Sequence, residues 1–256
     1  MKTPLFLLCA LASVAANAQS IGPVYEPQGG PTELIITYRC PPPRRAGFRQ
    51  YMTEAGIQRF DGWKRDGVLK DYKLLFNWYV DVDTWDAMAV LSFPSYAEAA
   101  RWNEIERINP GGLTRDALDI AWPLNTYSTD LVWQGSDTAN PAQDPSRSVY
   151  FVVPYDSGGD FRDYADSYFI PQAKGWMKEG ILASYRIYKN RYPGGKRWQA
   201  LAILEYKDID AFGRRDQVAA KVKAELQGDP AWKASNARQK TNLEREPVMA
   251  SALLAH

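Results

Sequence analysis

Residues 62–93 read GWKRDGVLKDYKLLFNWYVDVDTWDAMAVLSF, and residues 175–206 read GWMKEGILASYRIYKNRYPGGKRWQALAILEY. The second stretch is a counterpart of the first at a constant displacement of 113 residues without a gap, and the correspondence extends over residues 48–101 and 161–214. A fixed long-period repeat indicates the architecture before any local pattern does. The chain is therefore predicted to carry two related domains that pair with each other.

The residues that the two copies share are mostly glycine, aromatic and small apolar residues. They include Phe48 and Phe161, Gly62-Trp63 and Gly175-Trp176, Gly67 and Gly180, Asn77 and Asn190, Tyr79 and Tyr192, Trp85 and Trp198, and Ala89 and Ala202. The copies differ where Phe76 and Trp78 correspond to Lys189 and Arg191. If only one domain cavity is functional, the aromatic strand face of copy one is expected to form the apolar pocket.

The first eighteen residues have the composition of a secretory signal peptide. Lys2 supplies the positive charge, residues 5–16 form a short apolar stretch, and Ala16-Asn17-Ala18 matches a small-residue cleavage site. No later stretch approaches the ~20 apolar residues that a helix needs to span a bilayer. The mature chain is predicted to be soluble, without a membrane span, and periplasmic or secreted after cleavage behind Ala18.

The charges are almost balanced, with 31 Lys and Arg residues against 30 Asp and Glu residues. A broad basic surface is therefore not expected, and nucleic acid is a poor candidate partner. Removal of the signal peptide would take Cys9 with it, so that Cys40 would be alone in the mature chain. Because Cys40 ends an apolar run, it is predicted to be a small buried residue rather than a nucleophile.

His256, the last residue, is the only histidine of the chain. A Ser-His-Asp or Cys-His site would have no internal imidazole, and the same holds for a haem or a zinc ion held by histidines. Asp81, Asp83 and Asp86 surround one turn, but their spacing matches no EF-hand loop, so no metal site is predicted. No cofactor is predicted, and acid–base chemistry would fall to Asp, Glu, Tyr, Lys or water.

The hydrophobic periodicity predicts the order β-α-β-β-α-β in each copy, which is the ferredoxin-like order. The expected strands are 33–39, 69–80, 85–93 and 127–133, then 148–154, 181–192, 197–206 and 247–254, with helices from 45, 95–108, 161–169, 209–226 and from 229. The predicted organisation is a signal peptide (1–18), an N-terminal arm (19–31), domain 1 (32–135), a linker (136–147) and domain 2 (148–256).

A four-stranded sheet with helices on one face leaves its other face to be covered, and the second sheet is the natural cover. The predicted fold is therefore α+β, with two tandem ferredoxin-like domains that pair as an intramolecular α/β barrel. This doubled order resembles the dimeric α/β-barrel superfamily, which includes antibiotic-biosynthesis-type monooxygenases, EthD-like proteins and NIPSNAP-type proteins. The local likeness is to the NIPSNAP type, in residues 32–38 (TELIITY), Gly67-Val68-Leu69, Gly180-Ile181-Leu182 and Asp229-Pro230-Ala231-Trp232.

The resemblance implies a cavity between sheet and helices that holds small, often aromatic molecules. Some members oxidise phenolic substrates without metal or flavin, through Asn, Trp, Tyr and Arg side chains, and others isomerise, dehydrate or degrade haem. The branch that holds haem through a proximal histidine is excluded by the absence of an internal histidine.

Asn77, Tyr79, Asn190 and Tyr192 are the candidate catalytic residues, because they recur near the ends of the second strands. An amide can orient a carbonyl or phenol, and a neighbouring phenol can donate a proton or stabilise an oxyanion. The alternatives are that the amides fix the neighbouring turns and that the tyrosines pack the barrel.

The candidate ligand-binding residues are the cations and indoles that recur in both copies. They are Arg49, Arg162, Lys73, Arg186, Trp85 and Trp198. The arginines of the first helices could reach a carboxylate, and Lys73 and Arg186 share the strand face of the two asparagines, where they would favour an anion. Surface ion pairs for the arginines and hairpin packing for the tryptophans are the alternatives.

The predicted function is that of an exported protein which binds a small organic molecule, aromatic or not, in an α/β-barrel cavity. The sequence leaves open whether it is a cofactor-independent lyase, isomerase or monooxygenase, a non-catalytic periplasmic ligand-binding protein, or a structural partner in the cell envelope. The expected partner is a small-molecule ligand, and a homo-oligomer remains open.

Overall fold

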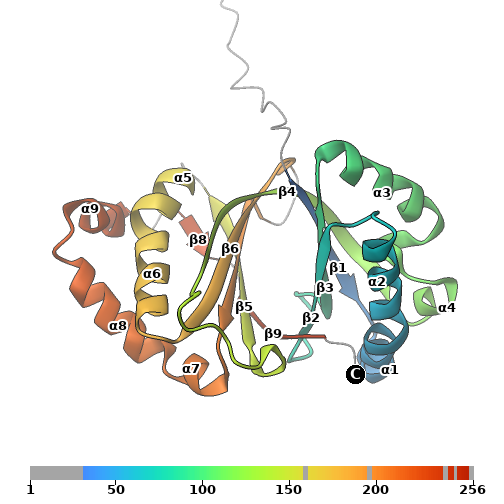
Figure 1. The fold of residues 1–256 in the computed structure, drawn as a ribbon, viewed down its shortest axis with the longest axis horizontal. Coiled ribbons are helices and arrows are strands. Elements are labelled where there is room, and N and C mark those ends of the chain that lie inside the picture. The colour runs from blue at the N-terminus through green and yellow to red at the C-terminus, as the bar shows by residue number, and fades with distance from the viewer. Residues whose placement is uncertain (1–30, 158–160, 195–197, 239–241, 245–246, 254–256) are drawn as a thin grey trace, which may run out of the picture.

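The computed structural model of the chain describes residues 31–157, 161–194, 198–238, 242–244 and 247–253 (Figure 1). The predicted signal peptide and all but the last residue of the predicted arm, residues 19–31, lie outside the described residues. Among the described helices, none is long and apolar enough to cross a membrane.

The first half of the chain follows the predicted order. Its strands are β1 (Thr32–Arg39), β2 (Asp71–Asn77), β3 (Ala87–Phe93) and β4 (Trp122–Ser136). Its helical elements are η1 (Pro42–Arg44), α1 (Arg45–Tyr51), η2 (Met52–Gly56), α2 (Ile57–Arg65), α3 (Tyr96–Ile108), η3 (Pro110–Gly112) and α4 (Arg115–Leu118).

The second half repeats this order with an additional helix before its last strands. Its strands are β5 (Val149–Ser157), β6 (Leu182–Asn190), β7 (Ala200–Tyr206), β8 (Asn242–Glu244) and β9 (Val248–Ala252). Its helical elements are η4 (Pro145–Arg147), α5 (Phe161–Tyr164), η5 (Ala165–Phe169), α6 (Ile170–Lys178), α7 (Ile209–Gly213), α8 (Arg215–Leu226) and α9 (Pro230–Arg238).

The strands form a closed antiparallel barrel. The sheet order runs β7-β6-β4-β1-β3-β2-β9-β5, and β5 pairs with β7 to close it. Within this order the first half contributes β4-β1-β3-β2 and the second contributes β9-β5-β7-β6, so each half has the ferredoxin-like strand order. The pairs β2–β9 and β4–β6 join the halves. The α+β class and the closed barrel are thus confirmed, while a tandem duplication as its origin stays a prediction.

β4 spans residues 122–136, whereas the sequence predicted a strand over 127–133. It is longer because it has two partners: residues 122–129 pair with β1, and residues 129–136 pair with β6. The strand therefore extends to the predicted end of domain 1 at residue 135 and includes the first residue of the predicted linker, 136–147.

The helices lie on the outside of the barrel, those of the first half on one side and those of the second half on the other (Figure 1). This arrangement buries both faces of the strands, so seven of the eight residues of β1 are buried. Alternate residues of β1 enter different cores: Ile35 packs inside the barrel, and Leu34 and Ile36 pack under the helices. The described residues thus form three apolar cores, one in the barrel and one under the helices of each half.

The first helical segment of each half ends in the same way. Gly67 and Gly180 have φ values of 74° and 76°, the left-handed region in which glycine is favoured. The N–H of Val68 donates to the carbonyl of Trp63 at 2.8 Å, and Ile181 repeats this bond to Trp176 at 3.1 Å. The 113-residue correspondence therefore holds for the backbone conformation at these two positions.

Cys40 follows β1 and is buried. Its backbone N–H donates to Asp86 Oδ2 at 2.9 Å. Burial, with the Asp86 carboxylate nearby, raises the pKa of the Cys40 thiol to about 12. The thiolate is therefore strongly disfavoured at neutral pH, which agrees with the prediction of a small buried residue rather than a nucleophile.

Candidate functional site

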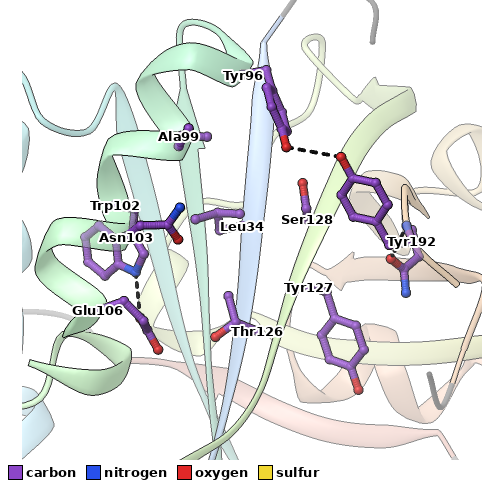
Figure 2. Close-up of a pocket in the computed structure, with 12 residues that line it drawn as sticks. Leu34, Tyr96, Ala99, Trp102, Asn103, Glu106, Thr126, Tyr127, Ser128 and Tyr192 are labelled. Carbon is purple, nitrogen blue, oxygen red and sulfur yellow. Dashed lines mark hydrogen bonds between the residues drawn. The ribbon is translucent and has the colours of Figure 1, made fainter. Parts of the chain in front are cut away.

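A pocket of about 460 Å³ lies in the first half, between α3 and the outer face of β1 and β4. Figure 2 shows α3 on one side of this pocket and β4 on the other. The α3 side is formed by Tyr96, Ala99, Ala100, Trp102, Asn103 and Glu106. Its volume falls within the range of ~300–1,000 Å³ that is typical of small-molecule sites. We call it the α3 pocket.

The orientation of α3 follows from its N-terminus and its spacing. The Ser95 hydroxyl caps the helix by accepting the N–H of Glu98 at 3.3 Å. Residues three and four apart share one helix face. Tyr96, Asn103 and Glu106 therefore lie on the face of α3 that borders the pocket. Ser95 thus starts the helix that forms the pocket wall.

The strand side of the pocket combines apolar and hydroxyl groups. Leu34 of β1 lies in the middle of it, and Thr126 and Ser128 of β4 point toward α3 (Figure 2). Tyr127, between them, points into the barrel, where its ring lies 4.4 Å from that of Trp198. The Ser128 hydroxyl oxygen is buried and finds no hydrogen-bond partner within the described part of the chain.

Two tyrosines meet at one end of the pocket. Their hydroxyl oxygens, Tyr96 Oη and Tyr192 Oη, lie 3.1 Å apart and link α3 of the first half to the segment after β6 of the second half (Figure 2). This hydrogen bond is the main cause that raises the pKa of Tyr192. The guanidinium of Arg191 lies 4.9 Å from the centre of the Tyr96 ring.

Arg191 itself is buried and paired. Its Nε lies 2.9 Å from Asp130 Oδ1, and its Nη2 bonds to the same carboxylate and to Thr32 Oγ1. Its Nη1 is buried and finds no partner among the residues that the structure describes. The ion pair therefore fixes the position of the segment that carries Tyr192.

The opposite end of the pocket carries a carboxylate. Glu106 Oε2 accepts the indole N–H of Trp102 at 2.9 Å, as Figure 2 shows. Trp102 is buried, with 1% of its surface exposed, so its indole orients the carboxylate. Among the described residues that line the pocket, Glu106 is the one with a formal charge.

The second half lacks this space because aromatic side chains fill it. Asp208 caps α7 as Ser95 caps α3, at the same displacement of 113 residues, which makes Phe212 the counterpart of Ala99. The Phe212 ring lies 5.7 Å from that of Phe151 and 6.4 Å from that of Trp78. Small residues in the first half therefore leave a pocket where rings pack in the second half.

The pocket is in the first half, where the sequence favoured it, but the reason given there was wrong. Phe76 packs in the core under α1 and does not line the pocket. Trp78 packs against Phe212 of the second half and donates to Ser251 Oγ at 2.6 Å. Trp78 thus fills space in the other half, and Phe76 fills the core of its own half, so neither forms a pocket.

The two candidate asparagines make equivalent hydrogen bonds within their hairpins. Asn77 Nδ2 donates to the carbonyl of Trp85 at 3.0 Å, and its Oδ1 accepts the N–H of Tyr79 at 3.0 Å. Asn190 makes the same two bonds with Trp198 and Tyr192, at 3.2 and 3.1 Å. Both amides therefore fix turns. Of the two, Asn190 also lines the α3 pocket.

The two candidate tyrosines lie at the surface, with 61% of Tyr79 and 57% of Tyr192 exposed. Tyr192 lines the pocket mouth, whereas Tyr79 does not line the pocket. Trp85 and Trp198 are buried in the barrel core, so they pack instead of presenting a stacking surface at the α3 pocket.

Lys73 and Arg186 both lie inside the barrel, at the end opposite the asparagines. Lys73 Nζ lies 3.1 Å from Tyr150 Oη and 3.7 Å from Glu205 Oε2. Burial lowers the pKa of Lys73, and the nearby Arg186 contributes to the lowering. Glu205 and Glu33 balance the two cations, so the predicted pair meets but is neutralised by carboxylates.

Arg49 and Arg162 lie outside the pocket, on the exposed sides of α1 and α5. The guanidinium of Arg49 lies 5.4 Å from the ring centre of Phe76, and that of Arg162 lies 5.6 Å from the ring centre of Trp133. The structure therefore does not gather the ten predicted site residues in one place: Asn190 and Tyr192 line the α3 pocket, and the others lie elsewhere.

The sequence did not single out the pocket residues of α3 and β4. Ser95 at the helix start and the helical spacing could have oriented α3, but the pocket depends on Ala99 being small where the second half has a ring. In the described part of the chain there is no group of three or more His, Cys, Asp or Glu side chains that could hold a metal ion. Haem held by imidazole does not fit these residues, because His256 is the only histidine.

The sequence matches no protein-family model and no curated protein. Solved structures share the fold at low identity. A proposed monooxygenase from Fusobacterium nucleatum subsp. nucleatum is 14% identical with a TM-score of 0.54, over 88% of this chain and 93% of that chain. An anthrone oxidase-like protein is 13% identical with a TM-score of 0.50, over 90% and 92%.

A single-substitution variant of the chlorite dismutase from Candidatus Nitrospira defluvii is 9% identical with a TM-score of 0.51, over 88% of this chain and 92% of that chain. At these identities the likeness shows the fold alone. The fold is thus that of the dimeric α/β barrels, as the resemblance in the sequence implied.

Proposed function

We propose that the protein binds a small, flat organic molecule in the α3 pocket. The observation that carries this proposal is the contrast between the halves: Ala99 leaves a pocket of about 460 Å³ where its counterpart Phe212 closes the space. An aromatic or conjugated ring would lie along Leu34 between α3 and β4, and the Thr126 hydroxyl would bond to its polar substituents.

The test is to fill the pocket in the way that the second half fills it. Binding of 2-naphthol, 1,4-naphthoquinone and anthrone to the full chain is measured by isothermal titration and thermal shift. Ala99→Phe is expected to weaken the binding of any of these ligands at least tenfold. Ala97→Phe is the matched control, because Ala97 is exposed on the same helix and does not line the pocket. Binding that Ala99→Phe leaves intact, or no binding at all, would contradict the proposal.

One measurement distinguishes a protein that only binds the ligand from a cofactor-independent enzyme that converts it. The ligand that binds is incubated with the protein in air and under nitrogen, and the products are identified by mass spectrometry. A product that needs oxygen supports a monooxygenase, a product of equal mass supports an isomerase, and loss of a small molecule supports a lyase. Recovery of the unchanged ligand supports a binding protein, periplasmic if the export proposal below holds.

The proposed compartment is the periplasm or the exterior, and it rests on the composition of residues 1–18. Expression of the full chain in a bacterial host, followed by fractionation and N-terminal sequencing, tests it. A mature chain that begins at Gln19 in the exported fraction is expected. An uncleaved chain in the cytoplasmic fraction would contradict export.

A further inference from the structure

We infer that the α3 pocket selects flat aromatic molecules that carry a positive charge, and that Glu106 is the residue that sets this selectivity. The inference rests on the proposed function and concerns the charge of the ligand. The sequence instead suggested a ligand that carries a carboxylate, because arginines were expected at the site.

The first argument is the charge of the lining. Glu106 is the charged group among the described lining residues, and its neighbours in the pocket are hydroxyl, amide and apolar groups. The nearest guanidinium at the opposite end belongs to Arg191, and Asp130 neutralises it through a buried ion pair. An anionic ligand would therefore lose its hydration without gaining a counter-ion.

The second argument is the geometry of the carboxylate. The indole N–H of Trp102 holds Glu106 Oε2, which leaves Oε1, and no described side chain pairs with that oxygen. Glu106 is half-buried, so its attraction for a cation is screened less than that of a fully exposed carboxylate. An ammonium group could donate to Oε1 while the indole bond keeps the carboxylate in place.

The third argument is the aromatic lining. Tyr96 and Tyr192 border the pocket with exposed rings, 37% and 57% of each residue being exposed, and the faces of such rings attract organic cations. Rings combined with one carboxylate are a chemistry that recognises alkylammonium groups. The rings alone would accept any flat molecule, so the carboxylate is what distinguishes a cation from a neutral or anionic relative.

The test uses three probes with the same ring system. They are 2-naphthylmethylammonium, 2-naphthylmethanol and 2-naphthoate, titrated calorimetrically into the full chain at pH 7. The ammonium is expected to bind about five- to tenfold more tightly than the alcohol, and the carboxylate more weakly than both. Glu106→Gln, which keeps the acceptor oxygen and removes the charge, is expected to abolish the preference for the ammonium.

Glu104→Gln is the matched control, because Glu104 is an exposed residue of the same helix outside the pocket lining. It removes the same charge from the protein, so a long-range effect of net charge would appear in both variants. Melting curves of the two variants establish that both are folded.

The failures of the two proposals are distinguishable. Equal binding of the three probes, tighter binding of the naphthoate, or a preference that survives Glu106→Gln would overturn the inference and leave the pocket as a small-molecule site. Absence of binding by all three probes, together with no binding of the neutral compounds above, would overturn the proposed function as well.

Discussion

Ala99 and Phe212 occupy equivalent positions, each four residues after the N-cap of the helix that packs on its half of the barrel. One is a methyl group at the edge of an open pocket, and the other is a ring that contacts Phe151 and Trp78. A difference of one side chain at this position thus accompanies the difference between a space that is filled in one half and a pocket in the other.

Phe212→Ala is expected to create a cavity in the second half, because a buried ring is removed from between two others. Loss of a buried phenylalanine lowers the free energy of unfolding by about 3–5 kcal/mol. Urea denaturation followed by circular dichroism measures the change. A loss below about 1 kcal/mol would show that the neighbouring rings close the gap or that Phe212 does not fill it.

The Arg191–Asp130 pair is expected to couple the mouth of the pocket to the stability of the fold. The two side chains are buried, with 2% and 13% of their surfaces exposed. Removing one partner leaves a buried charge, so Asp130→Asn is expected to cost about 3–5 kcal/mol of unfolding free energy. The double variant Arg191→Met with Asp130→Asn should cost less than Asp130→Asn alone. Additive losses in denaturant titrations would contradict such a coupling.

The repeat allowed most of the fold to be predicted, since the apolar alternation and the glycine positions each carry local structural information. Gly67 and Gly180, for example, both end helices with positive φ values. The extension of β4 could not be predicted from residues 122–126, because its length is set by pairing with two strands that are distant in the sequence.

The pocket was less predictable than the fold. Asn77 and Asn190 recur in the repeat because both hairpins need them: their amides fix the turns. The α3 pocket must depend on residues that differ between the halves, because Phe212 fills the equivalent space in the second half. Ala99 is such a residue, but its effect appears only when the ring of Phe212 is seen in the equivalent place.

The buried carboxylates of the barrel are expected to affect stability in opposite directions as the pH changes. Burial raises the pKa of Glu33 above its ordinary value of 4.5, so the ionised form of Glu33 is disfavoured in the folded state and its contribution to stability falls as the pH rises through the folded pKa. The pKa of Glu205 is lowered, because Lys73, Ser184 and Tyr150 outweigh the effect of its burial. Its contribution is present above the unfolded pKa and is lost as the pH falls.

The unfolding free energies of the Glu33→Gln and Glu205→Gln variants are therefore expected to differ at neutral pH and to become similar in acid. At pH 7, Glu33→Gln should be neutral or stabilising, and Glu205→Gln should lower the unfolding free energy by about 1–3 kcal/mol through its lost charged hydrogen bonds. Below the pKa of each group the difference from the parent chain should shrink. Denaturant titrations from pH 3 to pH 8 check this, and parallel profiles for the two variants would contradict it.

Gly62 and Gly175 recur in the repeat, yet they are expected to respond differently to the same substitution. A Cβ atom at Gly175 would lie 2.4 Å from Val222 Cγ1, because α6 and α8 pack closely there. At Gly62 the nearest atom is the end of the flexible Arg65 side chain at 3.5 Å.

Gly175→Ala is therefore expected to cost about 1–3 kcal/mol through overpacking. Gly62→Ala is expected to add about 0.5–1 kcal/mol, since alanine is the better helix former. Each variant serves as the control of the other in thermal and urea denaturation, and equal effects of the two substitutions would show that the close approach of α6 to α8 does not constrain Gly175.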